Sequence, residues 1–414
     1  MQYAPTNIIY VNLLTDDLFN FIHEHADDDA VTLVLEASRY PEVNIRLAAN
    51  QIEARQRLKE KLPSWYENIR LYFPSPLSVE QCSSELTAVY KQKLIQPEDV
   101  ICDLTGGLGV DTFFLSRKAK RVAYIERNKA YCDAAIYNMG QLKASNVTVL
   151  HADAVDSLKQ NTSADVYYLD PARRGIGNKR MFALEDCEPD LTKIWSALCA
   201  KRARIIVKLS PMFDINRVLH QLPNLTEIHV VSVKNECKEL LAVADYPANR
   251  DIFPQKDVRI HCINLASSRE ELSFQCDYEA EKSAIVQIAH HIERYLYEPN
   301  ASLLKAGVYR TISERFELKK LHVNSHLYTS ENDLTTFPGR RFEVTDVYSF
   351  DNHLCKGLSA KIPKANLTVR NFPLSVDELR KRTRIVDGGD VYLFATTLSD
   401  NRKAIIRCLK ASGT

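Results

Sequence analysis

The chain has 414 residues, of which 45% are hydrophobic and 26% charged, and its formal net charge is +1. No stretch approaches the roughly 18 uninterrupted apolar residues of a membrane helix, and the N-terminus lacks the basic start and small-residue cleavage site of a secretory signal. These features predict a cytoplasmic globular protein of roughly two to four domains that has no membrane partner.

Cysteine and histidine usage argues against a disulfide-rich or zinc-binding protein. The ten cysteines are scattered without a CxxC pair, which favours reduced, buried thiols. The histidines of HEH at 23–25, the pair at 290–291 and HVNSH at 322–326 lack companion ligands nearby in the sequence. We predict no metal site.

The first region is expected to be helical. Apolar residues are spaced three and four apart through VTLVLEASRY and VNIRLAANQIEARQRLKEKL, and the prolines of FPSPLS at 73–78 end the pattern. Residues 1–85 carry 7 Lys and Arg against 13 Asp and Glu, a balance of −6, whereas residues 356–414 carry 12 against 5, a balance of +7. We predict an N-terminal helical domain at 1–85 and a basic C-terminal region that can attract a polyanion.

Short β-branched runs alternate with amphipathic helices from residue 86 to about 262, which is typical of an α/β fold with a parallel sheet covered on both faces. Strands are expected at 99–104, 121–126, 147–153, 165–170, 204–210, 227–233 and 239–245. Helices are expected at 111–119, 129–142, 190–200 and 214–221. Because only KNECK joins the last two strands, they should form an antiparallel hairpin at the edge of a Rossmann-like, seven-stranded sheet.

The C-terminal part is expected to be α+β. After the polar stretch SSREEL, the segments KSAIVQIAHHIERYLYEPN, SERFELKKLHVNSHLYTS and FEVTDVYSF predict helix and strand. In the last unit, VDGGD predicts a turn between two strands, with Gly388 and Gly389 supplying positive φ.

Three of the 12 glycines lie in DLTGGLG at 103–109, between the first predicted strand and its helix. Glycines gather where the chain turns tightly or passes close to a ligand, and ligands of open α/β sheets lie at the carboxyl ends of the strands. A nicotinamide dinucleotide would favour GxGxxG, but Thr112 stands at the third glycine's position. The DxxxGxG spacing from Asp103 to Gly109 favours S-adenosylmethionine instead.

One acidic residue closes each of four successive strands, namely Asp103, Glu126, Asp153 and Asp170. We expect Asp103 to face the amino-acid part of the cofactor, Glu126 to accept hydrogen bonds from both ribose hydroxyls, and Asp153 to meet the adenine amino group. Singly, each feature has a plain explanation, and Asp153 fits a helix cap equally well. Together they predict a cofactor site that also includes their neighbours Thr105, Gly106, Gly107, Gly109, Arg127 and Ala154.

At these residues the chain resembles a known family. The motifs DLTGGLGVDT, Glu126-Arg127-Asn128, YLDPARR, VKLSPMFD and NECKELL are similar to those of class I S-adenosylmethionine-dependent methyltransferases with a C-terminal THUMP-like domain, found mainly in bacteria. The resemblance covers most of the chain. It implies a methyltransferase domain at 86–266, a ferredoxin-like domain at 267–337 and a THUMP-like domain at 338–414. It also implies RNA, either rRNA or tRNA, as the substrate.

The residues after the fourth strand bear on the methyl acceptor. Enzymes that methylate exocyclic amines of bases commonly carry Asp or Asn, two prolines and an aromatic there, whereas here Asp170 and Pro171 are followed by Ala172 and Arg173. No cysteine lies in this motif, and Cys187 is expected to be buried, which disfavours a covalent route to carbon-5 of pyrimidines. We predict a nitrogen acceptor, with guanine as one candidate, and Asp170, Pro171 and Arg173 as catalytic residues.

Basic residues near the predicted site favour contact with RNA phosphates. Arg173 and Arg174 begin the loop RRGIGNKRMF, and Lys208 and Ser210 end the fifth strand at the same edge. The plain alternatives are a solvated turn and a lysine that reaches to solvent. The run LRKRTR is expected to follow phosphates instead of forming only a solvated face, through Arg380, Lys381, Arg382 and Arg384.

The favoured interpretation is therefore an RNA methyltransferase. Because DPARR departs from the commoner motif, a non-catalytic RNA-binding protein that retains the fold is an alternative. A third is an enzyme with a small-molecule or protein acceptor. The sequence indicates neither the modified nucleotide nor the number of subunits.

Overall fold

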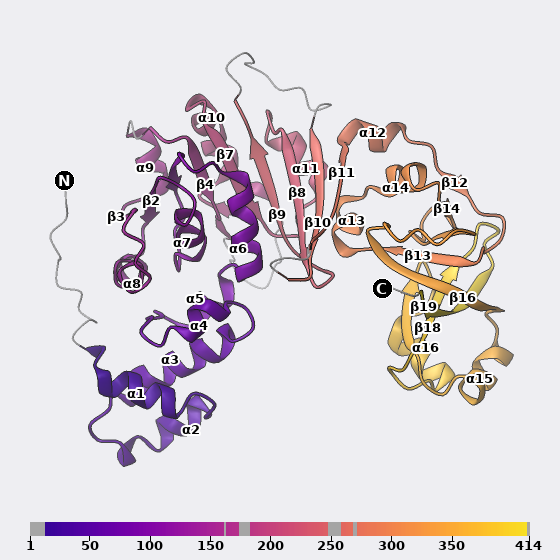
Figure 1. Ribbon diagram of the computed structural model, residues 1–414, viewed down its shortest axis with the longest axis horizontal. Coiled ribbons are helices and arrows are strands. Elements are labelled where there is room, and N and C mark those ends of the chain that lie inside the picture. The colour runs from indigo at the N-terminus through magenta and orange to yellow at the C-terminus, as the bar shows by residue number, and fades with distance from the viewer. Residues whose placement is uncertain (1–12, 161–162, 174–182, 247–257, 268–270, 412–414) are drawn as a thin grey trace. The chain divides into compact units, whose positions relative to one another are not determined.

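The computed structural model describes residues 13–160, 163–173, 183–246, 258–267 and 271–411 (Figure 1). The chain divides into two compact units, of which the first comprises residues 1–225 and 239–253 and the second residues 226–238 and 254–414. Within the described ranges, every helix is too short or too polar to cross a membrane.

The predicted N-terminal helices are present. They are α1 (Asp16–Glu24), α2 (Ala30–Leu35), α3 (Ile45–Leu58), α4 (Pro63–Glu67) and α5 (Pro76–Gln81). Thr15, Asp29 and Asn44 accept hydrogen bonds from backbone N–H groups at the starts of α1, α2 and α3, as capping residues do. Residues of these three helices form a small core of their own. Trp65 of α4 instead packs against Phe113 in the core of the neighbouring α/β part.

A mainly parallel sheet organises the first unit. Its strands are β1 (Val100–Asp103), β2 (Arg121–Glu126), β3 (Val147–His151), β4 (Val166–Leu169), β7 (Arg204–Leu209) and β9 (Glu236–Ala244). Their order is β9-β7-β4-β1-β2-β3. The neighbours from β3 to β7 pair in parallel, and β9 pairs antiparallel with β7. The predicted parallel α/β sheet is confirmed, and its order reverses between β1 and β4, where such sheets bind ligands.

Helices connect these strands. They are α6 (Glu85–Lys91), α7 (Val110–Ser116), α8 (Lys129–Gln141), α9 (Ala154–Lys159), α10 (Leu191–Ala200) and α11 (Ile215–Gln221). The connections through α7 and α8 lead from β1 to β2 and from β2 to β3, in one direction across the sheet. The connection through α9 leads in the other direction, from β3 past β1 to β4. Because such connections are right-handed, α7 and α8 cover one face of the sheet and α9 covers the other. The small strands β5 (Ala172–Arg173) and β6 (Cys187–Glu188) pair with each other after β4.

The connection between β8 (Glu227–Val233) and β9 is shorter than predicted. Lys234 and Asn235 alone separate the two strands, and both have positive φ, as in the two-residue turns that suit hairpins. The prediction that β9 starts at residue 239 was therefore wrong, because the rest of KNECK is already extended. The predicted bounds of β2 and β8 are confirmed.

The second unit contains β8, the strands β10 and β11, and a separate eight-stranded sheet. Because β10 and β11 continue the sheet of β8, that sheet has nine strands instead of the predicted seven, and the hairpin of β8 and β9 is not at its edge. β10 (Arg259–Leu265) pairs in parallel with β8 and antiparallel with β11 (Glu271–Asp277). The helices are α12 (Tyr278–Ser283), α13 (Ala301–Ala306), α14 (Tyr309–Arg315), α15 (Asn352–Lys361) and α16 (Val376–Thr383). The remaining strands are β12 (Gln287–Ile288), β13 (Tyr295–Pro299), β14 (Lys319–Lys320), β15 (Tyr328–Ser330), β16 (Gly339–Ser349), β17 (Asn366–Arg370), β18 (Val391–Thr397) and β19 (Lys403–Lys410). They form one sheet in the order β12-β14-β15-β13-β16-β19-β18-β17.

Two sequence predictions for the second unit can be compared directly. The segment KSAIVQIAHHIERYLYEPN contains only the end of α12 and the strands β12 and β13. Gly388 and Gly389 have the predicted positive φ, of 99° and 82°. They precede β18, whose partner β17 is parallel and reached through α16, so this turn does not close a hairpin.

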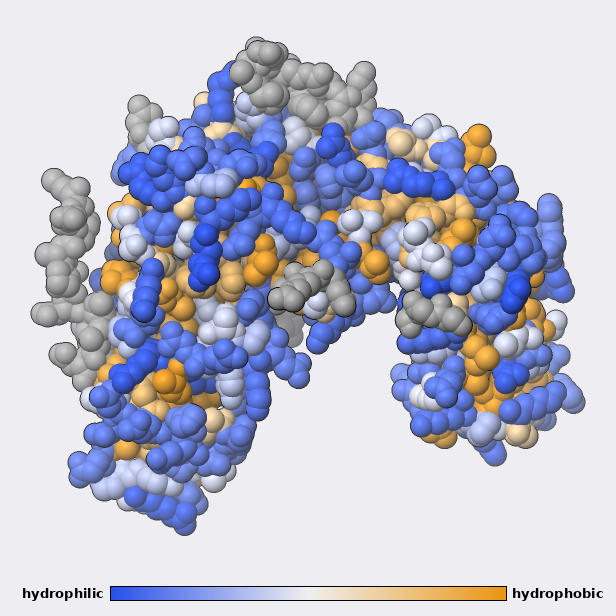
Figure 2. Space-filling model, in the orientation of Figure 1, coloured by the Kyte–Doolittle hydropathy of each residue, from blue (hydrophilic) through white to orange (hydrophobic). Residues whose placement is uncertain are grey.

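Hydrophilic side chains cover most of the face drawn in Figure 2, and hydrophobic ones show there as separate patches.

Candidate active site

The glycine turn follows β1 and leads into α7, and each glycine has its own structural reason. A Cβ on Gly106 would lie 2.2 Å from the ring of Tyr124, so only glycine lets the turn pack on β2. Gly107 and Gly109 have φ of 54° and 84°, which favours glycine. The Tyr124 hydroxyl donates a hydrogen bond to the carbonyl of Gly107 at 2.6 Å and so holds the turn in place.

Asp103 stabilises this turn through two hydrogen bonds. Its carboxylate accepts hydrogen bonds from the Thr105 N–H at 3.0 Å and from the Thr112 hydroxyl at 2.5 Å. The side chain is buried, and burial raises its pKa to about 7 against the opposing effect of the two hydrogen bonds. Thr112, which stands where a dinucleotide motif has its third glycine, therefore holds the Asp103 carboxylate in place.

Glu126 is the last residue of β2, and Asp153 lies two residues after the end of β3. Glu126 accepts hydrogen bonds from the N–H groups of Gly107 at 3.0 Å and Asn128 at 2.7 Å, which connects the end of β2 to the glycine turn. Asp153 caps α9, and one oxygen, Oδ1, accepts from the N–H groups of Val155 and Asp156. The capping interpretation of Asp153 is thus confirmed, and it does not use the second oxygen.

Asp170, at the end of β4, is held by two other elements. Its backbone N–H donates to Oγ1 of Thr105 at 2.6 Å, and its carboxylate pairs with Nζ of Lys208 on β7 at 2.5 Å. Burial alone would lower the pKa of Lys208, but the carboxylates of Asp170, Asp111 and Glu239 raise it above its usual value. The lysine is therefore a permanent cation beside Asp170.

A buried cluster of charges lies beside this pair, and sequence reasoning missed it. Lys91 of α6 is fully buried, and its Nζ lies 2.9 Å from Glu239 on β9 and 3.1 Å from Asp111 on α7. Asp111 also accepts hydrogen bonds from the hydroxyls of Ser83 and Tyr168, both at 2.7 Å. Four elements of the first unit, together with the loop that contains Ser83, thus supply one polar network next to β4.

The charges of this network are balanced by their neighbours. Burial would raise the pKa of Asp111, but Lys91 and Lys208 hold it below its usual value. Burial raises the pKa of Glu239 and, together with the nearby carboxylates, that of the Tyr168 hydroxyl, which therefore stays a donor. One sequence signal was present, because Glu239 opens the apolar run ELLAVA of β9.

The structure places the other predicted residues as follows. Arg127 forms an ion pair with Glu188 at 2.5 Å, and Ala154 is the buried first residue of α9. Pro171 is buried, and Ser210 is half-buried and accepts a hydrogen bond from the Met212 N–H at 3.3 Å. Cys187 is buried, as predicted. Arg173 belongs to β5, and Arg174 lies outside the described residues.

The basic C-terminal run forms α16 and its end. Lys381, Arg382 and Arg384 are exposed, and Arg384 ends the helix with φ of 60°. Arg380 instead forms an ion pair with Asp387 and donates to the carbonyl of Ile385. Three of the four predicted phosphate contacts are therefore open to solvent in the second unit.

Comparison with protein families identifies the C-terminal part. Residues 295–338 match a family model described as a ferredoxin-like domain, and residues 339–410 match one described as THUMP domain-like. Among curated proteins, an uncharacterised RNA methyltransferase of Mycoplasma mobile is 36% identical over 91 residues, which are 21% of this chain and 25% of that protein. One of Thermotoga maritima is 28% identical over 120 residues, which are 29% of this chain and 27% of that protein. The chain thus spans about a quarter of the length of the curated relatives it matches.

A solved structure is similar along the whole chain. The crystal structure of a candidate methyltransferase from Porphyromonas gingivalis W83 is 36% identical in sequence, covers 100% of both chains and superimposes with a TM-score of 0.88. The helical N-terminus, the α/β part and both C-terminal domains therefore occur together in that protein as well.

Proposed function

This chain belongs to the family of the Porphyromonas gingivalis protein, and we propose that it is a methyltransferase that uses S-adenosylmethionine to methylate a base nitrogen of rRNA or tRNA. One observation carries the proposal. The carboxylates of Asp103, Glu126, Asp153 and Asp170 lie at or just beyond the ends of four strands that are adjacent in the sheet, in the order β4-β1-β2-β3, around a glycine turn. This edge is where an open α/β sheet binds its ligand.

The residues of the turn fit the cofactor. A Cβ on Gly107 would meet no atom closer than the Thr105 carbonyl oxygen at 3.8 Å, so the backbone borders open space there. Glu126 is fixed beside this space by two backbone N–H groups and would accept hydrogen bonds from ribose hydroxyls. The second oxygen of Asp153 would meet the adenine amino group. Since the pKa of Asp103 is raised to about 7, a nearby ammonium group of the cofactor would favour the charged carboxylate and be attracted by it. When bound, S-adenosylmethionine supplies a methyl group on a sulfonium that leaves readily.

Asp170 and Lys208 would position the methyl acceptor. Transfer of a methyl group depends mainly on holding the nucleophile in line with the methyl carbon. The ion pair with Lys208 fixes the direction of the Asp170 carboxylate, which would accept a hydrogen bond from an amine or ring N–H of the base. Arg173 belongs to β5, and we propose that it and Arg174, the next residue in the sequence, contact phosphates.

The C-terminal domain would supply RNA affinity. Residues 356–414 carry a balance of +7, and Lys381, Arg382 and Arg384 are exposed around the end of α16. Contacts between such cations and phosphates are independent of sequence and weaken as salt increases. We therefore propose that this surface orients structured RNA for the catalytic domain.

The test is transfer of labelled methyl groups from S-adenosylmethionine to total RNA of cells that lack the gene. The proposal predicts incorporation into one RNA class by the wild-type protein, a methylated base nitrogen on nucleoside analysis, and loss of incorporation with Asp170→Asn. RNA from cells that retain the gene should accept little label, because its site is already methylated.

Other outcomes would support the alternatives. RNA binding with salt dependence but without label in any RNA would indicate a non-catalytic RNA-binding protein. Label in protein or in small molecules, with no competition by RNA, would indicate a different acceptor. Charge reversal with Lys381→Glu and Arg382→Glu should weaken RNA binding and leave cofactor binding unchanged.

A further inference from the structure

Two strands of the second unit bring together three residues typical of metal sites. Glu227 and His229 are two residues apart on β8, so their side chains lie on the same face of the sheet. His261 on the parallel strand β10 is in register with His229. The backbone of adjacent strands, rather than a loop, therefore fixes the positions of all three side chains.

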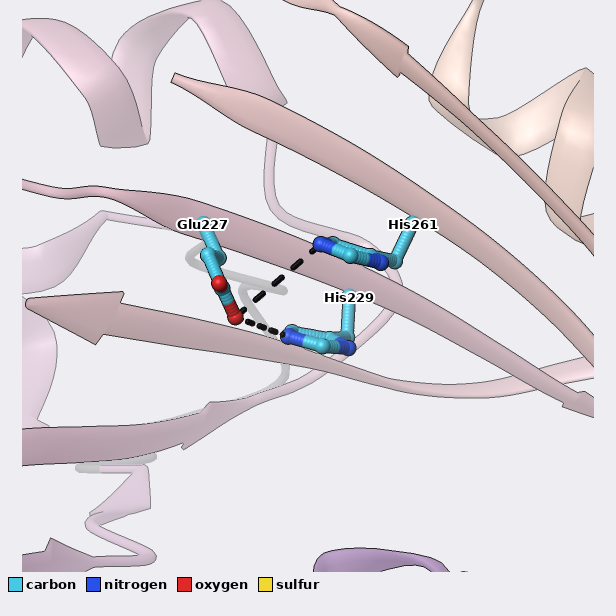
Figure 3. A group of neighbouring side chains, drawn as sticks. All are labelled: Glu227, His229 and His261. Atoms are coloured by element: carbon cyan, nitrogen blue, oxygen red, sulfur yellow. Dashed lines mark hydrogen bonds and ion pairs between the residues drawn. The ribbon is translucent and has the colours of Figure 1, made fainter. Parts of the chain in front are cut away.

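The potential ligand atoms converge (Figure 3). Oε2 of Glu227 lies 2.9 Å from Nε2 of His229 and 3.9 Å from Nε2 of His261. The two rings are stacked, with centroids 4.3 Å apart and planes at 5°, and both present Nε2 toward the same carboxylate oxygen. All three ligand atoms lie within 4.8 Å of one another. Ligands at about 2.0–2.1 Å from a tetrahedral zinc ion lie roughly 3.3 Å apart, so small rotations of the side chains would complete the site.

One of these ligand atoms lacks a hydrogen-bond partner. Nε2 of His261 is buried and has no hydrogen-bond partner, an arrangement that costs free energy in a folded protein. Solvent still reaches the cluster, because the side chains of Glu227 and His261 are 27% and 18% exposed. Gln275 of β11, which pairs with His261 across the two strands, is also exposed. An ion can therefore enter from solvent, and a water molecule can fill a further coordination position.

We propose that Glu227, His229 and His261 bind a zinc ion through two imidazole nitrogens and one carboxylate oxygen. This ligand set suits zinc, and three protein ligands leave one position of the tetrahedron open. The ion links β8 to β10 and so stabilises the second unit. The sequence analysis missed the site because the ligands come from two strands whose pairing the sequence does not reveal.

The test uses the full-length protein, stripped of metal by chelator and titrated with Co²⁺ and Zn²⁺. Wild-type protein should bind one Co²⁺ per chain at this site, with the intense visible absorption of a four-coordinate ion, and Zn²⁺ should displace it. Zn²⁺ should also raise the unfolding temperature. His261→Ala and Glu227→Gln should each weaken Zn²⁺ binding at least about tenfold, since even residues that only orient ligands cost this much, and remove the gain in unfolding temperature.

Matched variants separate this site from others. His353 is exposed and outside the cluster, so His353→Ala should bind as wild type does. A second group of metal-binding residue types, His291, Glu293 and Glu331, is mostly exposed, and His291→Ala should also leave the visible absorption unchanged. The proposal is overturned if His261→Ala and Glu227→Gln bind Zn²⁺ like wild type, or if His291→Ala alone removes the binding. Glu227→Gln keeps the side chain's shape, so it tests the site even if His261→Ala fails to fold.

Discussion

The Thr105 hydroxyl oxygen accepts a hydrogen bond from the backbone N–H of Asp170 at 2.6 Å. Thr105 belongs to the glycine turn after β1, and Asp170 directly follows β4. The bond therefore connects the place where the cofactor is proposed to bind with the place where the methyl acceptor is proposed to lie. Because misplacement of reacting groups by about 1 Å can cost roughly 100-fold in rate, such a connection bears directly on catalysis.

Replacing Gly106 with alanine should disrupt the turn. The new Cβ would lie 2.2 Å from the Tyr124 ring, and overpacking of this kind costs about 1–3 kcal/mol or more. We expect a lower unfolding temperature and loss of cofactor binding by calorimetry. Gly140 of α8 is the matched control, because a Cβ there meets nothing within 4 Å. Gly140→Ala should stabilise the protein by about 0.5–1 kcal/mol; equal behaviour of both variants would contradict the role given to the turn.

Removing the cation beside Asp170 should impair transfer more than cofactor binding. Lys208→Met deletes the partner that fixes the carboxylate at 2.5 Å, and misplacement of a reacting group by about 1 Å can cost roughly 100-fold in rate. We expect single-turnover methyl transfer to RNA to fall by about that factor while cofactor affinity changes little. Lys193→Met removes the ion pair of an exposed lysine with Asp190 and should leave both quantities unchanged. Full activity of Lys208→Met would show that the pair is only structural.

The buried lysine should matter for stability in a way that surface lysines do not. Lys91→Met leaves Asp111 and Glu239 buried without the cation that contacts both, and breaking such a pair costs about 3–5 kcal/mol. Chemical denaturation should show this loss. Lys120, whose ion pair with Glu98 is exposed, provides the control, and Lys120→Met should change stability by at most about 1 kcal/mol. Similar losses in both variants would mean that the network is not held by charge.

Acid should destabilise the second unit partly through His326. Burial, helped by the charges of Lys320 and Arg370, lowers the pKa of this histidine from 6.5 to about 4. The unfolded chain therefore takes up a proton before the folded one does, so the contribution is present above pH 6.5 and is lost as the pH falls toward 4. The unfolding temperature of wild type relative to His326→Gln should fall across this interval. A constant difference between the two proteins would refute the shift.

Local patterns in the sequence predicted most of the α/β part. β2 and β8 have the expected bounds, because β-branched runs bounded by polar residues define a buried strand well. The short helix α9 was missed, since its six residues are too few for a clear periodicity. In KSAIVQIAHHIERYLYEPN the pairing of β12 and β13 in a sheet decides the structure, and pairing with distant strands cannot be inferred from spacing alone.

The candidate site was predictable only where it follows the strand ends. Asp103 and Glu126 end their strands, and Asp170 and Asp153 lie one and two residues beyond theirs, so the alternation of strands and helices locates them. Lys91 and Glu239 contact each other from positions 148 residues apart, and His261 reaches His229 only through strand register. Such contacts depend on the tertiary arrangement, which no local pattern contains.

The most direct test of the account is calorimetric binding of S-adenosylmethionine, and of its demethylated product, to the wild-type protein and to Glu126→Ala. Glu126 is the carboxylate that joins β2 to the glycine turn through Gly107. We expect one cofactor per chain for wild type and no measurable binding for Glu126→Ala, with the variant still folded and its affinity for RNA nearly unchanged. A folded wild-type protein that binds neither compound, or that binds a nicotinamide dinucleotide at this turn instead, would contradict it.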